Sequence, residues 1–219
     1  TVRKRPKVLL IGMLDSIHFA RWISQLDGLE MDFVITGTSP YRKIRPELRT
    51  FVAKHESQFA IMEIFPRLVV FGRRVLPAAA FILDRICSDQ VRGRLLSRLI
   101  AREQPDLVHV NELIVSGFAF EAALKRMSGD VPRVWVTNYG SELVWRLQSS
   151  TDLARAKNLL QHSSHFSAEC SRDVEIAREL GFRGEALPVN PVSGGLPIST
   201  LDSCPRRGVL AVKGYDNRI

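Results

Sequence analysis

Short runs of apolar residues alternate along this chain with segments in which apolar residues recur at helical spacing. The first run, Val8–Ile11, is continuous and rich in aliphatic side chains, which is typical of a parallel strand covered on both faces. Gly12 follows and lets the backbone turn, and Ser16 is a residue type that caps helices. Apolar residues then recur at helical intervals over Ser16–Leu26. The opening therefore predicts a strand, a short loop and a helix.

The same alternation continues through most of the chain. Further strands are predicted at Met31–Thr36, Ala60–Ile64, Leu107–Val110, Val134–Thr137, Phe166–Cys170 and Glu185–Val189. Helices are predicted at Phe118–Arg126, Leu153–Leu160 and Arg172–Leu180, with Ser116 and Gly117 in the loop before the first of them. Strands that alternate with helices indicate βα units joined by right-handed crossovers. The predicted fold class is α/β, with a Rossmann-like parallel sheet flanked by helices.

Composition shifts near the end of the chain. Leu201–Arg207 is linker-like, and Gly208–Tyr215 then begins a fresh apolar run and loop. We therefore expect one Rossmann-like domain over residues 1–200. Residues 201–219 are expected to form a linker and the first strand of a truncated C-terminal domain.

The excess positive charge is concentrated in one segment. The 219 residues carry a formal net charge of +8, and Tyr41–Arg102 holds 13 Lys or Arg against 5 Asp or Glu, so the remainder is neutral. Apolar residues recur there at helical spacing, which predicts amphipathic helices with an arginine-rich face. Such a face suits an anionic membrane surface, and an ordinary solvated helix face is the alternative. The residues expected to face the membrane are Arg73, Arg74, Arg92 and Arg94.

Other classes of protein fit the sequence less well. No recognised DNA- or RNA-binding motif accompanies the basic segment, so nucleic acid is not an expected partner. No run of 18 uncharged apolar residues predicts a membrane span. The three cysteines are widely separated and odd in number, which suits a reducing cytosol better than a disulfide framework or a zinc cluster. We expect a cytoplasmic location, peripheral on the inner membrane face, and no bound metal.

Small and polar residues after the strands suggest contacts with phosphate groups. Phosphates favour exposed backbone N–H groups at a helix N-terminus. The loop with Gly12, Asp15 and Ser16 fits this requirement, as do Gly140 and Ser141; tight turns between strand and helix are the alternative. Neither loop carries a dinucleotide fingerprint.

Groups that can orient a substrate hydroxyl or take its proton also lie near the strand ends. His18, His109 and Glu112 are the candidate catalytic residues, because imidazole and carboxylate groups can take up a proton at neutral pH. Asn111 lies beside them as a polar contact. The alternatives are a strand-end histidine satisfied by a carbonyl for His109 and a solvated carboxylate for Glu112. Arg21 is either a phosphate contact or a helix-surface residue.

Several runs together resemble a known family. They are Ser16–Trp22, Pro105–His109, Gly140–Leu143, the stretch Glu169–Phe182 and the pair Gly194–Gly195. In order and spacing they resemble the N-terminal domain of GT-B glycosyltransferases, specifically those of family four that build bacterial surface polysaccharides.

The resemblance implies the N-terminal half of a GT-B two-domain architecture. In such enzymes the N-terminal domain binds a saccharide or lipid-linked acceptor, and the missing C-terminal domain holds a nucleotide-sugar donor. This domain alone is then expected to bind no cofactor and to be inactive. The cleft residues that the resemblance adds are Asn138, Tyr139, Glu142, Gly194 and Gly195. Many members carry His where this chain has Tyr139, so the histidine's role does not carry over.

Two other functions compete with glycosyl transfer. One is nucleotide-sugar 2-epimerisation on the same fold, which needs several carboxylates and histidines in the cleft. The other is a non-catalytic membrane-docking module that uses the face of Tyr41–Arg102.

Overall fold

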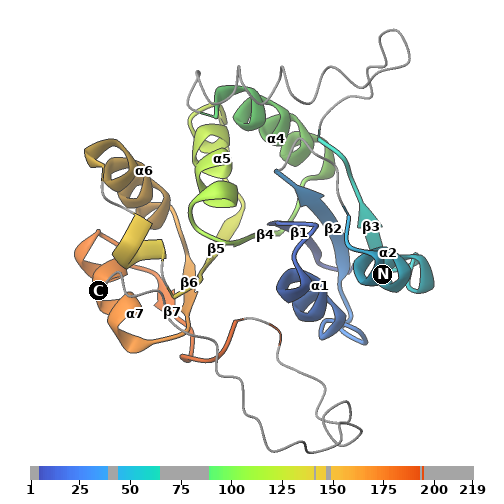
Figure 1. The fold of residues 1–219 in the computed structure, drawn as a ribbon. Helices are drawn as coiled ribbons and strands as arrows, with labels where there is room; N and C mark the ends of the chain where they lie inside the picture. Colours follow the sequence, from blue (N-terminus) through green and yellow to red (C-terminus); the bar gives the residue numbers. More distant parts are fainter. Residues whose placement is uncertain are drawn as a thin grey trace, which may run out of the picture.

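The central element is a seven-stranded sheet in which every strand is parallel to its neighbours (Figure 1). The computed structural model describes residues 5–38, 44–64, 89–140, 142–146, 149–192 and 194. The strand order is β3-β2-β1-β4-β5-β6-β7. The strands are β1 (Lys7–Gly12), β2 (Asp32–Gly37), β3 (Phe59–Ile61), β4 (Leu107–Asn111), β5 (Arg133–Asn138), β6 (His165–Ala168) and β7 (Glu185–Ala186). This arrangement confirms the expected α/β, Rossmann-like fold class.

Helices cover the sheet on both faces, as Figure 1 shows. Those of one face follow β1 and β2, and those of the other follow β3 to β6. The first group is α1 (Ile17–Ser24) and α2 (Pro46–Lys54), and the second is α4 (Gln90–Glu103), α5 (Val115–Leu124), α6 (Ser150–Gln161) and α7 (Ser171–Glu179). A π-helical turn, η1 (Glu142–Arg146), follows β5.

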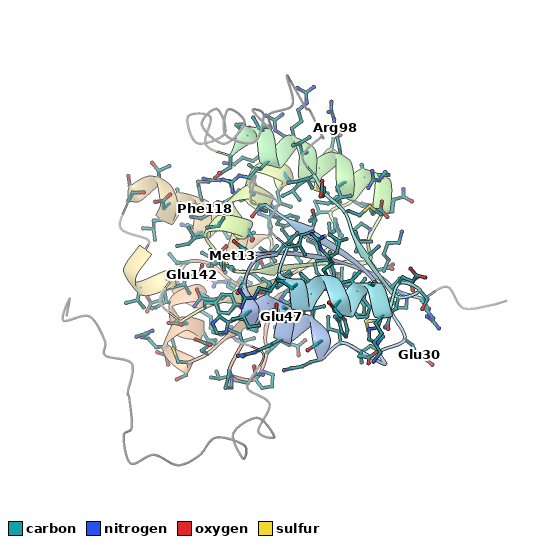
Figure 2. All side chains as sticks on the ribbon, turned by 45° about the vertical axis from the view of Figure 1, so that its right-hand side comes forward. Met13, Glu30, Glu47, Arg98, Phe118 and Glu142 are labelled. Atoms are coloured by element: carbon teal, nitrogen blue, oxygen red, sulfur yellow. The ribbon has the colours of Figure 1, made fainter. Side chains whose placement is uncertain are left out.

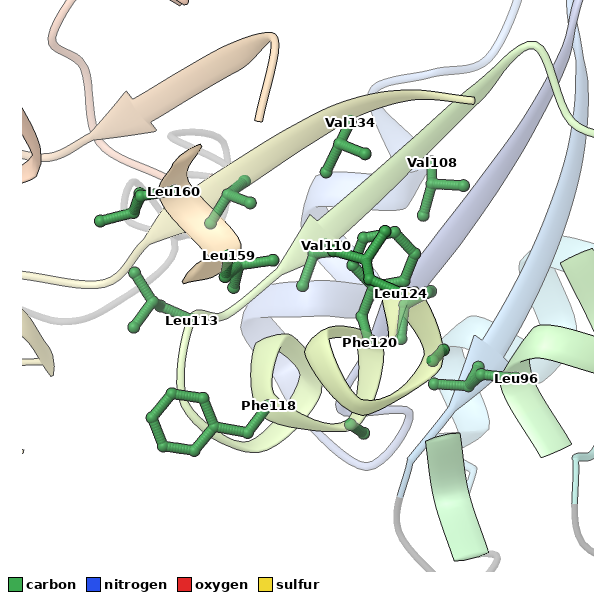
Figure 3. Close-up of a cluster of buried hydrophobic side chains, with 14 of the residues drawn as sticks. Leu96, Val108, Val110, Leu113, Phe118, Phe120, Leu124, Val134, Leu159 and Leu160 are labelled. Carbon is green, nitrogen blue, oxygen red and sulfur yellow. The ribbon is translucent and has the colours of Figure 1, made fainter. Parts of the chain in front are cut away.

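Each face of the sheet has its own apolar core. Alternate strand residues point to opposite faces, so Leu9 and Ile11 pack toward α4–α7 whereas Val8 and Leu10 pack toward α1 and α2. Figure 3 shows the larger core, where Val108 and Val110 of β4 meet Phe120 of α5. Close contact between α4 and α5 requires Gly93, because a Cβ there would lie 2.7 Å from the Cβ of Ala122.

Helix α5 begins earlier than expected. Ser116 and Gly117 were predicted in a loop, and both lie in the first turn of the helix. The Glu112 side chain accepts hydrogen bonds from the backbone N–H groups of Val115 and Ser116, each at 2.7 Å, so it supplies the cap that the sequence lacks at its usual position. Position 117 requires glycine, because a Cβ there would lie 2.8 Å from the Leu159 side chain.

Other boundaries differ by a few residues, and one helix was not predicted. Strand β7 ends at Ala186 rather than Val189: Leu187 still donates to the Phe166 carbonyl, but the next bond to β6, at 3.4 Å to the Ala168 carbonyl, comes from Asn190 instead of Val189, so the register is lost. Helix α2 begins at Pro46, a favoured first helical residue that marks its start in the sequence. The expected linker and strand at residues 201–219 lie outside the described residues.

The chain changes direction across the sheet between β1 and β4. From β1 it proceeds to β2 and β3 on one side, and from β4 to β7 on the other. Open α/β sheets bind ligands at the carboxyl ends of the strands beside such a switch point. The loops after β1, β4, β5 and β6 therefore form the candidate site.

Candidate functional site

The first loop joins β1 to α1 at the carboxyl edge of the sheet. Ser16 caps α1, and its hydroxyl oxygen accepts from the backbone N–H of Phe19 at 3.4 Å, as the sequence predicted. Gly12 is the last residue of β1, and a Cβ there would lie 2.6 Å from the Phe19 ring. Close packing is therefore a sufficient reason for glycine at this position. Asp15 and His18 are exposed.

A pair of buried carboxyl groups joins the loops after β4 and β5. Glu112 and Glu142 are each 2% exposed and hydrogen-bonded to one another. Glu142 Oε2 accepts from the backbone N–H groups of Leu113 and Tyr139, both at 3.0 Å, and Oε1 accepts from Ile114 at 3.3 Å. Burial, together with the hydrogen bond and charge of Glu112, raises the pKa of Glu142 to about 9.

This burial bears on the expected role of Glu112. Its carboxylate is withdrawn from solvent and caps α5, so neither a solvated carboxylate nor a base in contact with an acceptor fits its position. Its backbone has a φ of 113°, a conformation that non-glycine residues adopt only under constraint. The side chain holds the loop after β4 in place.

Tyr139 lies over this pair and contacts the end of β4. Its hydroxyl donates to Asn111 Oδ1 at 2.7 Å. Burial raises the pKa of Tyr139, and the negative charges of Glu142, Glu112 and Glu169 raise it further. The Tyr139 phenol is therefore neutral and acts as a hydrogen-bond donor.

Residues after β6 complete the edge, and the sequence analysis did not select them as site residues. Exposed Glu169 accepts from the backbone N–H of Gly140 at 3.3 Å, and Arg172 donates to the Gly140 carbonyl at 3.1 Å. Asp173 is buried, pairs with Arg172 at 2.9 Å, and accepts from the Asn138 amide at 3.0 Å. Glu169 was predicted inside the strand Phe166–Cys170, but β6 ends at Ala168; for Arg172, a position at the start of the helix that follows a predicted strand was the signal.

His109 lies in the middle of β4 and is completely buried. Its Nε2 is 2.7 Å from the hydroxyl oxygen of Thr137, and the edge of Trp22 covers the ring at a centroid distance of 4.6 Å. Burial lowers the pKa of His109 to about 3. The hydrogen-bond partner of His109 is thus the Thr137 hydroxyl, and not a carbonyl as expected for a purely structural histidine at a strand end. A neutral imidazole under Trp22 does not fit the expected role in proton transfer.

The remaining expected residues are dispersed. Gly194 lies against α1, where its carbonyl accepts from Gln25 Nε2 at 2.6 Å, and Arg21 is half-buried on the same helix.

Arg92 was expected to face the membrane, and this was wrong: its side chain is buried and paired with Asp89. Arg94 is exposed on α4, and Figure 2 shows Arg98 on the outer side of that helix. Four further candidates lie outside the described residues, namely Arg73, Arg74, Ser141 and Gly195.

The part of the chain that the structure describes contains no group of three or more His, Cys, Asp or Glu side chains placed to hold a metal ion. Over the same residues, none of the helices combines the length and apolar content needed to cross a membrane.

Comparison with known proteins identifies the fold but no family. No family model matches this chain, and no curated protein matches its sequence. Among solved structures, a UDP-N-acetylglucosamine 2-epimerase aligns with a TM-score of 0.54 and 16% identity, covering 82% of this chain and 46% of its own. A UDP-glucosyltransferase from Polygonum tinctorium that glucosylates indoxyl aligns with a TM-score of 0.53 and 15% identity, covering 94% and 57%. A putative UDP-N-acetylglucosamine 2-epimerase from Listeria monocytogenes has a TM-score of 0.51 and 15% identity, covering 82% and 43%.

These similarities support a GT-B-like fold shared by enzymes that handle nucleotide sugars. The chain spans about half the length of the solved structures that it matches. Transferases and epimerases lie equally near to it, so the likeness in fold does not distinguish between them.

Proposed function

We propose that this chain is the acceptor-binding half of a glycosyltransferase that moves a sugar from a nucleotide-sugar donor to a saccharide or lipid-linked acceptor. The similarity in fold to a UDP-glucosyltransferase about twice as long supports a role as one half of such an enzyme. The observation that carries the assignment to the acceptor is the negative field around Tyr139. Glu112 and Glu169 contribute to it, whereas Glu142, with a pKa of about 9, adds charge only in alkaline solution.

A negative edge selects one kind of ligand over another. Donor phosphates would be repelled by Glu112 and Glu169, because like charges in a poorly solvated site are costly. Sugar hydroxyls are neutral and donate hydrogen bonds to carboxylates. The edge therefore suits the hydroxyl-rich acceptor, and the donor phosphates are left to the C-terminal domain.

Glu169 is the residue best placed to take the acceptor's proton. It is exposed at the carboxyl edge and is held by the Gly140 N–H, and an accessible carboxylate of this kind can serve as a general base. In this proposal the Tyr139 hydroxyl orients the acceptor and Arg172 fixes the backbone beneath it. His18 is the exposed imidazole of the first loop and contributes a second polar contact.

The second candidate is epimerisation at C2 of a nucleotide sugar. Two of the aligned structures are 2-epimerases by description, each with a TM-score above 0.5. A carboxylic acid with a raised pKa, such as Glu142, suits the proton transfers of that reaction. The burial of both Glu112 and Glu142 counts against it, because a base must reach the sugar.

One experiment separates these functions. The chain extended through its C-terminal domain is incubated with UDP-N-acetylglucosamine or UDP-glucose, with and without a panel of saccharide acceptors, and products are followed by NMR. UDP release that requires an acceptor supports transfer, whereas the C2 epimer formed without an acceptor supports epimerisation. Titration of UDP into the 219 residues alone tests whether the donor binds elsewhere. Tight binding of UDP to these residues would contradict the proposal that they form the acceptor-binding half.

We also propose that α4 contacts an anionic membrane surface. Arg94 and Arg98 are both exposed, and they lie one helical turn apart. A basic helix face gains about 1 kcal/mol for each residue near anionic headgroups. Such a contact would hold the enzyme near a lipid-linked acceptor at the inner membrane face and would give it a peripheral, cytoplasmic location.

A further inference from the structure

The buried pair Glu112–Glu142 connects the two central loops of the candidate site. Through it, five backbone N–H groups are satisfied: those of Val115 and Ser116 by Glu112, and those of Leu113, Ile114 and Tyr139 by Glu142. Residues 113 and 114 directly precede α5, residues 115 and 116 begin it, and Tyr139 follows β5. Both loops therefore depend on the same two carboxyl groups.

The two carboxyl groups of the pair hold one proton between them. Two carboxylates in hydrogen-bond contact need a proton between them, and both are withdrawn from water, which makes a second negative charge costly. Backbone N–H groups at the start of α5 point at both carboxyl groups, but burial together with the hydrogen bond and charge of Glu112 raises the pKa of Glu142. The proton therefore lies on Glu142.

We propose that Glu112 and Glu142 share one proton and together form a clamp that positions Tyr139 and the loop after β4. They are positioning residues, because they act through the backbone of the residues that they hold. The inference rests on the proposed function only in giving Tyr139 a contact with substrate. The clamp itself requires no particular reaction.

The surroundings determine what happens when the shared proton is lost. Tyr139 after β5 contacts the pair, and the neighbouring charged groups are Glu169 after β6 and Arg172 on α7, which contact Gly140, and Asp173, which contacts Asn138. Asp173 neutralises Arg172, and Glu169 adds negative charge. Among the described residues, no cation forms an ion pair with Glu112 or Glu142, and loss of the proton leaves two carboxylates in contact. The clamp is then expected to open in alkaline solution.

Two measurements on the 219-residue chain test the clamp. The first follows the side-chain carboxyl ¹³C signals of the glutamates by NMR across pH, and the second follows hydrogen exchange of the Leu113 and Tyr139 amides. The variants are Glu142→Gln, which keeps an oxygen acceptor and supplies an N–H donor to Glu112, and Glu175→Gln, which removes an exposed carboxylate of α7 as a matched control.

We expect one carboxyl signal to titrate near pH 9 in the natural chain and in the control, and to vanish in Glu142→Gln. Protection of the two amides should fall by about tenfold for each pH unit above that pKa, and the added loss should disappear in Glu142→Gln.

Two results would overturn the proposal: a Glu142 signal that titrates near its ordinary value of 4.5, or an alkaline loss of protection that persists in Glu142→Gln. None of these measurements requires a sugar. If the clamp behaves as expected but the protein binds no acceptor, the proposed function is contradicted and the clamp is not.

Discussion

The imidazole of His109 lies parallel to the indole of Trp135, with their ring centroids 3.8 Å apart and their planes at 10°. Both residues belong to neighbouring strands and are paired in register. The Trp135 N–H donates to the hydroxyl of Ser167 at 2.9 Å, and Ser167 is 2.7 Å from the hydroxyl of Thr137, which contacts His109. The histidine is thus one member of a closed network across three strands.

Replacing His109 with Phe should make the protein more resistant to acid. The phenyl ring keeps the stacking on Trp135 and removes Nδ1, which has no hydrogen-bond partner among the described residues. Because the folded-state pKa of about 3 lies below the ordinary 6.5, the unfolded chain binds the extra proton, and stability is lost as the pH falls between these values. In chemical denaturation from pH 7 to pH 4, the variant should gain stability relative to the natural chain as the pH falls. His18→Gln, at an exposed position, should behave as the natural chain; an unchanged slope in His109→Phe would contradict the assignment.

The pH profile of stability should also show an alkaline decline caused by Glu142. Its folded-state pKa of about 9 exceeds the ordinary 4.5, so the folded state keeps a proton that the unfolded chain releases. The free energy of unfolding should therefore decrease as the pH rises from 4.5 to 9, by up to about 1.4 kcal/mol per pH unit. The opposing effect of His109 should flatten the profile between pH 4.5 and 6.5. Denaturation midpoints measured across pH check this, and a profile of the same slope in Glu142→Gln would contradict it.

Arg155 should be essential for stability. Its guanidinium group lies 2.6 Å from Asp89 and 3.2 Å from Glu121, which is almost completely buried between α5 and α6. Arg155→Met leaves these carboxylates short of a partner and should lower the free energy of unfolding by about 3 kcal/mol. Lys125→Met is the matched control, because Lys125 contacts the same Glu121 from a side chain that is 54% exposed, and it should cost less than about 1 kcal/mol. Equal losses from the two variants, measured by urea denaturation, would contradict a buried network.

If the proposed function is right, Glu169→Gln should reduce turnover by the chain joined to its proposed donor domain while leaving the fold intact. The amide oxygen can still accept from Gly140, but a neutral side chain takes no proton, so kcat should fall by about 100-fold or more. KM for the acceptor should change little. Glu169→Asp should restore part of the rate, and full activity of Glu169→Gln would remove Glu169 as the base.

Reversing two arginines on α4 should weaken binding to anionic vesicles. Arg94→Glu with Arg98→Glu should reduce co-sedimentation with phosphatidylglycerol vesicles by about thirtyfold or more, at roughly 1 kcal/mol for each basic residue. Arg178→Glu, at an exposed position of α7, is the control and should bind as the natural chain does. Equal binding by all three proteins would show that α4 is not the contact.

The sequence alone determined the fold class and most of the strands. Continuous apolar runs such as Val8–Ile11 avoid water only when helices cover both faces of the sheet. The segments between the runs have helical spacing, so helices connect successive strands, and strands connected in this way are parallel. The sequence also located the loops at the carboxyl edge, since that position depends only on where each strand ends. It missed α2, which lies within the basic segment, because the apolar pattern of that helix is weak and only Leu48 in it is buried.

Tertiary structure decided which of the polar residues are accessible. His109 and Glu112 share residue types with exposed groups, and no local pattern shows that Trp22 covers the first or that Glu142 meets the second. Each depends on a side chain distant in sequence or on the packing of a neighbouring helix. Burial and pKa are set by these contacts, because desolvation and nearby charge act through space rather than along the chain. The same contacts left Glu169 exposed beside Tyr139, a relationship between β5 and β6 that exists only once the strands are paired.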